Sequence, residues 1–197
     1  MAIQKFIESR PAAFLHDNFR CIRFPAAFAL REITEILSLC DGVVNVAVVT
    51  SATTILSLLE SLPLQRLVVF WAEYFTTASC LNLTHLTHLG IRDWRDNALD
   101  PWYGLSLIPR LTHLSFYDLN AVVLATVGVL QRCQSLGLLV ILCGNQFRFN
   151  WALDVRDTPV EKLVADPRFC MLVVHDHWHD DDWEVGARGG RCGHTCA

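Results

Sequence analysis

The stretch Leu83–Ile91 reads LTHLTHLGI, and the motif LTHL returns in LTHLSF at Leu111–Phe116. In both stretches an apolar residue is followed three residues later by a second one, and two residues after that by a third. Self-similarity at a long, regular spacing is the sequence signature of a repeat architecture. The leucines therefore predict a repeating structural unit, and the histidines occupy the same place in two successive units.

The apolar pattern of these two stretches occurs seven times along the chain. All steps between copies except the last, which is longer, fall in the range in which one strand and one helix form a repeat unit. In the seventh copy, Phe169, Leu172 and Val174 are the predicted core residues. The copies begin at Phe19, Val43, Leu64, Leu86, Leu111, Leu136 and Phe169.

The segments between the copies carry apolar residues at helical spacing. Helices are predicted over 29–40, from residue 51 onwards and over 121–134, each with one apolar face. Cys40 and Cys133 each lie three residues before a copy begins. This shared register indicates that both are small buried residues that close a helix. A redox role is less favoured, because neither has a nearby CxxC partner.

Two connections depart from this scheme. Trp94–Leu105 contains Pro101 and two tryptophans, and we expect a packed loop there rather than a regular helix. The segment 144–168 lengthens the last step, and we expect it to hold a surface insertion followed by a short helix around 160–165. Such irregular connections are where repeat proteins vary most and where loops can carry function.

In these segments the sequence resembles the leucine-rich-repeat family, in its ribonuclease-inhibitor-like form. The resemblance covers about residues 19–190 and is clearest in REITEILSLCDGVVNVAVV, LIPRLTHLSFYDL and VLQRCQSLGLLVIL. The chain looks most similar to fungal leucine-rich-repeat proteins described as F-box-like. The resemblance implies an α/β fold: a leucine-rich-repeat solenoid of about seven degenerate repeats, with a curved parallel sheet and helices on its convex side.

The resemblance divides the chain into an N-terminal cap at 1–18, a solenoid at 19–174 and a C-terminal tail at 175–197 that is acidic, His-rich and Gly-rich. Two features differ from the family pattern. The Asn or Cys that follows each strand is replaced, and no F-box precedes the repeats because the residues before Cys40 already belong to them. The replaced positions hold Ser51, Ala72, Trp94, Leu119 and Gly144.

Composition excludes several functional classes. The chain has 197 residues, of which 52% are hydrophobic, with a net charge of −4 and scattered Lys and Arg, so no nucleic-acid footprint is visible. The N-terminal stretch lacks the apolar region of a secretion signal, so the eight cysteines are expected to be reduced in the cytosol or nucleus. The apolar segment 121–143 carries Gln131, Arg132 and Gln134 at its middle, which favours a helix followed by a strand over a membrane span.

Strand alternation converts the repeat into a map of the concave surface, because side chains two residues apart share a face. His88 and His113 should be neighbours, and Arg92 should lie between Phe70 and Tyr117. An apolar patch should follow toward the C-terminal end. Its members are Leu138, Val140, Leu142, Met171 and Val173, with His175 at the end of the last strand.

Metal binding and catalysis have weaker signals. The histidine pair lacks the third and fourth ligands that zinc sites use. In HDHWHDDDW, His175, His177 and His179 alternate along one face of an extended strand, but their spacing matches no established zinc pattern. GARGGRCG lacks the ending of a phosphate-binding loop, and no GxSxG or HExxH motif is present. We expect neither an enzyme nor a cofactor.

The sequence therefore favours a non-enzymatic module that binds an unknown protein partner, with no nucleic acid, membrane or small-molecule substrate. Two alternatives stay open: a truncated F-box-like ubiquitin-ligase adaptor paralogue without activity of its own, and a metal-binding protein that uses the C-terminal histidines. Aromatic and arginine side chains are the usual anchors of interfaces. The candidate partner-binding residues are Arg66, Phe70, His88, Arg92, His113 and Tyr117.

Overall fold

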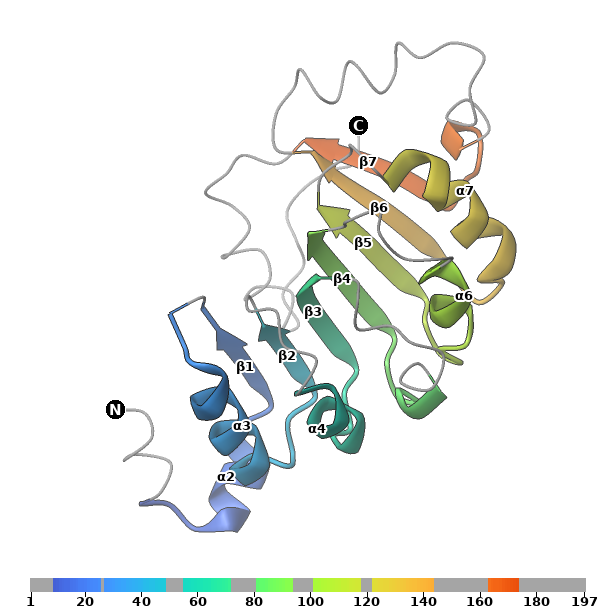
Figure 1. Cartoon of the computed structure of the whole chain (residues 1–197). Helices are drawn as coiled ribbons and strands as arrows, with labels where there is room; N and C mark the ends of the chain where they lie inside the picture. Colours follow the sequence, from blue (N-terminus) through green and yellow to red (C-terminus); the bar gives the residue numbers. More distant parts are fainter. Residues whose placement is uncertain are drawn as a thin grey trace.

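A seven-stranded, all-parallel sheet forms the centre of the molecule (Figure 1). The computed structural model describes residues 9–25, 27–48, 55–71, 81–93, 101–117, 122–143 and 163–173. Each strand pairs with the next one along the chain, so the spatial order is the sequence order. The strands are β1 (Cys21–Phe24), β2 (Asn45–Val48), β3 (Arg66–Trp71), β4 (His88–Asp93), β5 (His113–Tyr117), β6 (Leu138–Cys143) and β7 (Phe169–Val173).

The described helices lie along one side of this sheet (Figure 1). Parallel neighbours require a crossover connection, and here helical segments occur in most of these crossovers. None of the described helices is long and apolar enough to cross a membrane. The helices are α2 (Ala12–Asn18), α3 (Leu30–Leu39), α4 (Leu56–Ser61), α6 (Pro101–Ser106) and α7 (Val122–Arg132).

The core lies between the sheet and the helices, and the predicted apolar positions form it. From β1 to β6 the strands pair so that the same position of each copy lies side by side, as the regular spacing of the copies predicts. Two rows of buried side chains result. They are Val46, Leu67, Leu89, Leu114 and Leu139, and Phe24, Val48, Val69, Ile91, Phe116 and Ile141.

Four of the copies are preceded by a buried turn that ends the helical segment. Cys40 and Cys133 are 0% and 3% exposed, which confirms that both are buried as small apolar residues. Their carbonyl oxygens accept the N–H of the first residue of the copy, at 3.2 Å for Val43 and 3.1 Å for Leu136. Leu83 and Ile108 do the same before β4 and β5.

Helix α3 has the amphipathic pattern that the sequence predicts. Ile33, Ile36 and Leu37 are buried against the sheet, while Arg31 and Glu35 form an exposed ion pair of 2.8 Å one turn apart. The N-terminus is closed by the carboxylate of Glu32, which accepts the backbone N–H of Ala29 at 2.9 Å. An acidic group in the first turn also complements the helix dipole.

The register of the seventh strand differs from the predicted one. Phe169 pairs with Leu139 and Met171 with Ile141, so the copy begins three residues earlier than expected, at Asp166. Phe169 and Met171 pack against the core, and the prediction of Met171 and Val173 on the opposite face was wrong. The prediction failed because the strand FCMLV is apolar at every position, so no polar residue shows which of its two faces is turned away from the core.

The connection before β5 also differs in part. Pro101–Ser106 forms the helix α6, where we expected a packed loop. Proline is favoured in the first turn of a helix, because its missing N–H would have no helical partner there. Residues 94–100 of this connection lie outside the described residues, as do residues 1–8, residues 160–162 of the expected short helix and the C-terminal tail 175–197.

Candidate functional site

One face of the sheet is turned away from the helices, and we call it the histidine face. It consists of the strand residues that alternate with the core rows. Its described members include every predicted partner-binding residue except Phe70, whose side chain lies outside the description. They are Cys21, Arg23, Asn45, Ala47, Arg66, Val68, His88, Gly90, Arg92, His113, Ser115, Tyr117, Leu138, Val140, Leu142, Cys170 and Leu172.

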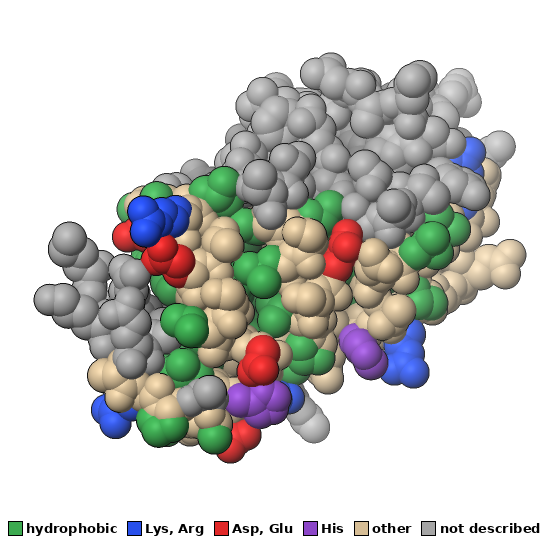
Figure 2. Space-filling model, turned by 60° about the horizontal axis from the view of Figure 1, so that its bottom comes forward, with side chains coloured by type: hydrophobic (Ala, Val, Ile, Leu, Met, Phe, Trp, Pro, Cys, Tyr) green, Lys and Arg blue, Asp and Glu red, His purple; other side chains and the backbone are tan. Residues whose placement is uncertain are grey.

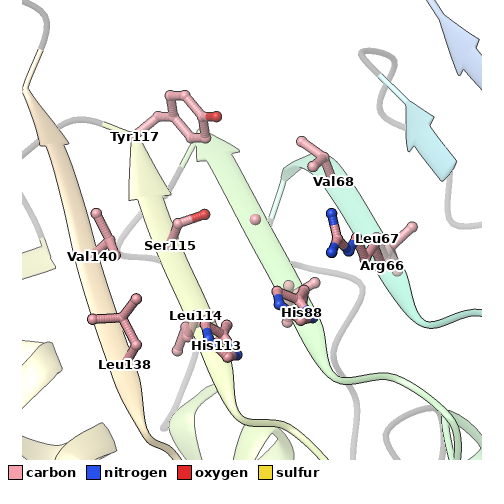
Figure 3. A pocket seen from close by; sticks show the side chains of 12 residues that line it. Arg66, Leu67, Val68, His88, His113, Leu114, Ser115, Tyr117, Leu138 and Val140 are labelled. Carbon is pink, nitrogen blue, oxygen red and sulfur yellow. The ribbon is translucent and has the colours of Figure 1, made fainter. Parts of the chain in front are cut away.

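The histidine face is hollowed at β4, where a cavity of about 290 Å³ lies above Gly90 (Figure 3). A Cβ atom at this position would come within 3.2 Å of both Ser115 Oγ and a methyl group of Val68. The missing side chain therefore opens the hollow. Figure 3 shows the histidines at one end of it, Tyr117 at the other and Arg66 on β3.

His88 and His113 stand side by side on β4 and β5, as the sequence predicts. Their rings are stacked, with centroids 4.1 Å apart and planes only 9° from parallel. Close stacking of this kind is tolerated by neutral imidazoles, whereas two imidazolium rings would repel each other. The geometry therefore disfavours a state in which both rings are charged.

A threonine fixes the orientation of each histidine. Thr87 Oγ1 donates to the carbonyl oxygen of Gln65 at 3.0 Å, and Thr112 Oγ1 donates to that of Thr87 at 3.1 Å. A hydroxyl has one proton, so each Oγ1 must accept a hydrogen bond from the adjacent histidine. The Oγ1–Nδ1 distances are 2.8 Å and 2.9 Å for His88 and His113. Both rings therefore carry a proton on Nδ1, and in a neutral ring Nε2 is then a hydrogen-bond acceptor.

Electrostatics favours the same neutral state. Burial, the neighbouring His113 and the cation of Arg66 lower the pKa of His88 from 6.5 to about 4. The pKa of His113 is also lowered, first by burial and then by Arg66. At neutral pH the pair offers two acceptor nitrogens beside a guanidinium that is a donor.

A second ordered pair lies farther along the same two strands. The guanidinium carbon of Arg92 sits 5.0 Å from the centre of the Tyr117 ring, which confirms the predicted stacking on this side. A cation over an aromatic face is held by the ring quadrupole. Arg92 and Tyr117 therefore present a defined cation and an aromatic edge at the Tyr117 end of the hollow.

The structure brings most of the predicted residues into one site and adds others. Thr87, Thr112 and Gly90 carry the site's geometry, although none was among the candidate residues. The first two had a visible signal, because the threonine recurs with the histidine in both LTHL motifs. Of the predicted apolar patch, the described face keeps Leu138, Val140 and Leu142.

Metal binding has no support within the described part of the chain, which contains no group of three or more potential ligands. The histidine pair supplies two, and the positive charge of Arg66 nearby opposes a cation. His175, His177 and His179 lie outside the described residues, so the structure does not bear on them.

No protein-family model, curated protein or solved structure matches this chain. The site must therefore be interpreted from its own chemistry. It combines a small hollow, acceptor nitrogens, arginine donors, an aromatic ring and aliphatic walls, all held on one sheet. Such a mixture is suited to recognising a side chain or a short segment of another molecule.

Proposed function

We propose that the chain is a leucine-rich-repeat solenoid that binds another protein through its histidine face, without catalysing a reaction. The fold is supported by β1 to β6, which follow one another at a nearly constant spacing along the chain with the same positions packed on the core in each. In such a solenoid the histidine face is the concave side, which commonly serves as the binding surface.

The observation that carries the binding proposal is the hollow above Gly90 between two ordered pairs of side chains. The stacked His88 and His113 and the stacked Arg92 and Tyr117 hold their positions before a partner arrives. Pre-organised side chains lose less conformational entropy on association. Tyr and Arg are also enriched among the residues that dominate binding energy.

The same chemistry favours binding over catalysis. A general base works best when its pKa lies near the working pH, and the pKa of His88 is about 4. The Nδ1 of each histidine is bonded to a threonine hydroxyl instead of a carboxylate that would strengthen the ring as a base. In this proposal the histidines contribute acceptors and shape.

Affinity capture with matched variants tests the proposal. The full chain is immobilised, and the proteins retained from a native extract are compared with those retained by the double variant His113→Ala, Tyr117→Ala. The control is Arg31→Ala with Gln131→Ala, two exposed positions on α3 and α7. We expect proteins that bind the wild type and the control and are lost from the double variant.

Circular dichroism first establishes that all three proteins are folded. If the double variant and the control retain the same proteins in the same amounts, the histidine face is not the binding surface and the proposal fails. Retained proteins that are lost from the control alone would move the interface to the helices.

A further inference from the structure

The histidine face has a charge opposite to that of the whole chain. The chain carries a net charge of −4. The described strand residues of this face include three arginines and two histidines but no aspartate or glutamate. On the part of the surface that Figure 2 shows, by contrast, acidic side chains are present, and some of them lie next to basic side chains or a histidine. Among the described strand residues, the positive charges are thus gathered on the surface that contains the hollow.

One of the three arginines lines the hollow, and a second lies against one of its lining residues. Arg66 lines its wall, and Figure 3 shows its guanidinium extending from β3 toward β4. A guanidinium has five N–H donors, so Arg66 can bind a carboxylate beside the interactions that it already makes. Arg92 adds a second cation beside Tyr117. A ligand that enters above Gly90 therefore meets Arg66 directly and has Arg92 beyond Tyr117.

We propose that the partner of the histidine face is an acidic protein segment, and that one of its Asp or Glu side chains enters the hollow above Gly90 to bind Arg66. The inference rests on the proposed function and names the chemistry of the partner. The volume of about 290 Å³ accommodates one side chain with part of its backbone, and Val68, Leu138 and Val140 cover its aliphatic stem.

The histidine pair then makes binding depend on pH. Its charged and titratable neighbours on the described face are Arg66 on β3, Arg92 on β4 and Tyr117 on β5, while β6 contributes only aliphatic side chains. In the free protein the pair is neutral at pH 7. A carboxylate placed beside the rings favours the imidazolium, so the pKa in the complex is higher than in the free protein. Binding takes up a proton, and affinity rises as the pH falls.

A peptide selection identifies the preferred chemistry even while the partner itself is unknown. A random twelve-residue library displayed on phage is selected on the immobilised full chain at pH 6, where the partner carboxylates remain ionised. We expect the recovered peptides to be enriched in Asp and Glu relative to the unselected library. Selection on Arg66→Gln, with Arg92→Gln as a second variant at the rim, should lose that enrichment.

The strongest recovered peptide is then titrated by calorimetry against the wild type and the variants. Replacing its acidic residues by Asn and Gln should weaken binding roughly tenfold or more. Affinity should be about tenfold higher at pH 5.5 than at pH 7.5 if one histidine regains its ordinary pKa in the complex. In the variant His88→Asn, His113→Asn the pH dependence should disappear, because asparagine keeps an N–H for the threonine and loses the titrating nitrogen.

Recovered peptides that are basic or uncharged, or acidic peptides that bind Arg66→Gln and Arg92→Gln as tightly as wild type, would overturn the inference. So would an affinity that is constant between pH 5.5 and 7.5. These outcomes are distinguishable from failure of the proposed function. If a captured partner is lost from His113→Ala, Tyr117→Ala but retained by Arg66→Gln and Arg92→Gln, the histidine face binds that partner, but not through an acidic side chain.

Discussion

At the scale of single residues, one threonine decides the chemistry of each histidine. Thr87 and Thr112 donate their only hydroxyl proton to a carbonyl of the preceding unit, so the adjacent rings must donate from Nδ1. The backbone ladder beneath the pair therefore sets which ring nitrogen carries the proton, while burial and Arg66 keep the rings neutral. Replacing a histidine and replacing its threonine should have related effects on the site.

The neutral pair predicts that stability falls in acid. The pKa of His88 is about 4 in the folded protein and 6.5 in the unfolded chain, so the unfolded chain binds protons more readily. The stabilisation of the folded state by neutral His88 is fully present above pH 6.5 and is lost as the pH falls toward 4. We expect the free energy of unfolding to fall by roughly 1–2 kcal/mol over this range, after allowance for solvent screening of half-buried rings.

Urea denaturation at a series of pH values measures this slope, and His88→Asn with His113→Asn is the control that should reduce it. Nitrogen-15 NMR of labelled histidine should show Nδ1 protonated in both rings at neutral pH. A His88 that titrates near its ordinary pKa would contradict the expected neutral pair.

Gly90 predicts a clean separation of binding from stability. In Gly90→Ala the new Cβ meets the ends of two side chains, Ser115 Oγ and a Val68 methyl group, which can move by a few tenths of an ångström. We expect a loss of about 1 kcal/mol or less in the free energy of unfolding. Gly90→Val fills more of the hollow, and a β-branched residue suits a strand.

The measurement is binding of a partner or selected peptide together with thermal unfolding. Gly90→Val should weaken binding at least roughly tenfold while the protein remains folded. Ser115→Ala, which enlarges the hollow slightly, is the matched control. Unchanged binding by Gly90→Val would show that nothing enters the hollow.

At the scale of elements, the register of β7 separates two rows of side chains that look alike in sequence. Met171 pairs with Ile141 and packs on the core, whereas Leu172 pairs with Leu142 on the histidine face. We expect Met171→Asp to cost about 3 kcal/mol, because it places a carboxylate against the core. Leu172→Asp should cost less than about 1 kcal/mol.

The urea midpoints of the two variants decide the register. The register predicted from the sequence would make Leu172→Asp the more destabilising of the two. Met171→Leu serves as a conservative control that keeps the apolar contact. Equal losses in the two aspartate variants would mean that both faces of β7 are covered.

The positions and register of most strands were predictable from the sequence, because polar residues show which face of a strand is turned away from the core. In His113–Tyr117 the polar His113 and Ser115 alternate with the buried Leu114 and Phe116, and the register follows. In Phe169–Val173 no polar residue marks a face, and Asp166 stands where the repeat begins with an apolar residue elsewhere. Local pattern could not reveal the site's tautomers either, because they depend on carbonyl groups of the preceding unit, far away along the chain.

At the scale of the whole molecule, strands that pair only with their sequence neighbours make stability a property of adjacent units. Strand β4 has a paired strand on each side, whereas β1 and β7 have one each within the described sheet. We expect amide protons of β3 to β5 to exchange most slowly with solvent and those of β1 and β7 fastest.

Native-state hydrogen exchange followed by NMR or mass spectrometry measures this order. A substitution in the central core, Phe116→Ala, should cost about 3–5 kcal/mol and raise exchange in neighbouring strands before distant ones. The control is Ser57→Ala on the exposed side of α4, which should leave the pattern unchanged. A uniform change in every strand would indicate a single cooperative unit instead.

The order of strands also determines how the molecule would respond to a mechanical load. A pull applied across β1 and β7 acts on the two ends of a stack in which each strand is paired only with its sequence neighbours. The end units should detach one after another, and each should release a length of chain of roughly 70–90 Å. In an optical trap the protein would therefore lengthen in successive steps, and it would extend under load instead of resisting it up to a single unfolding event.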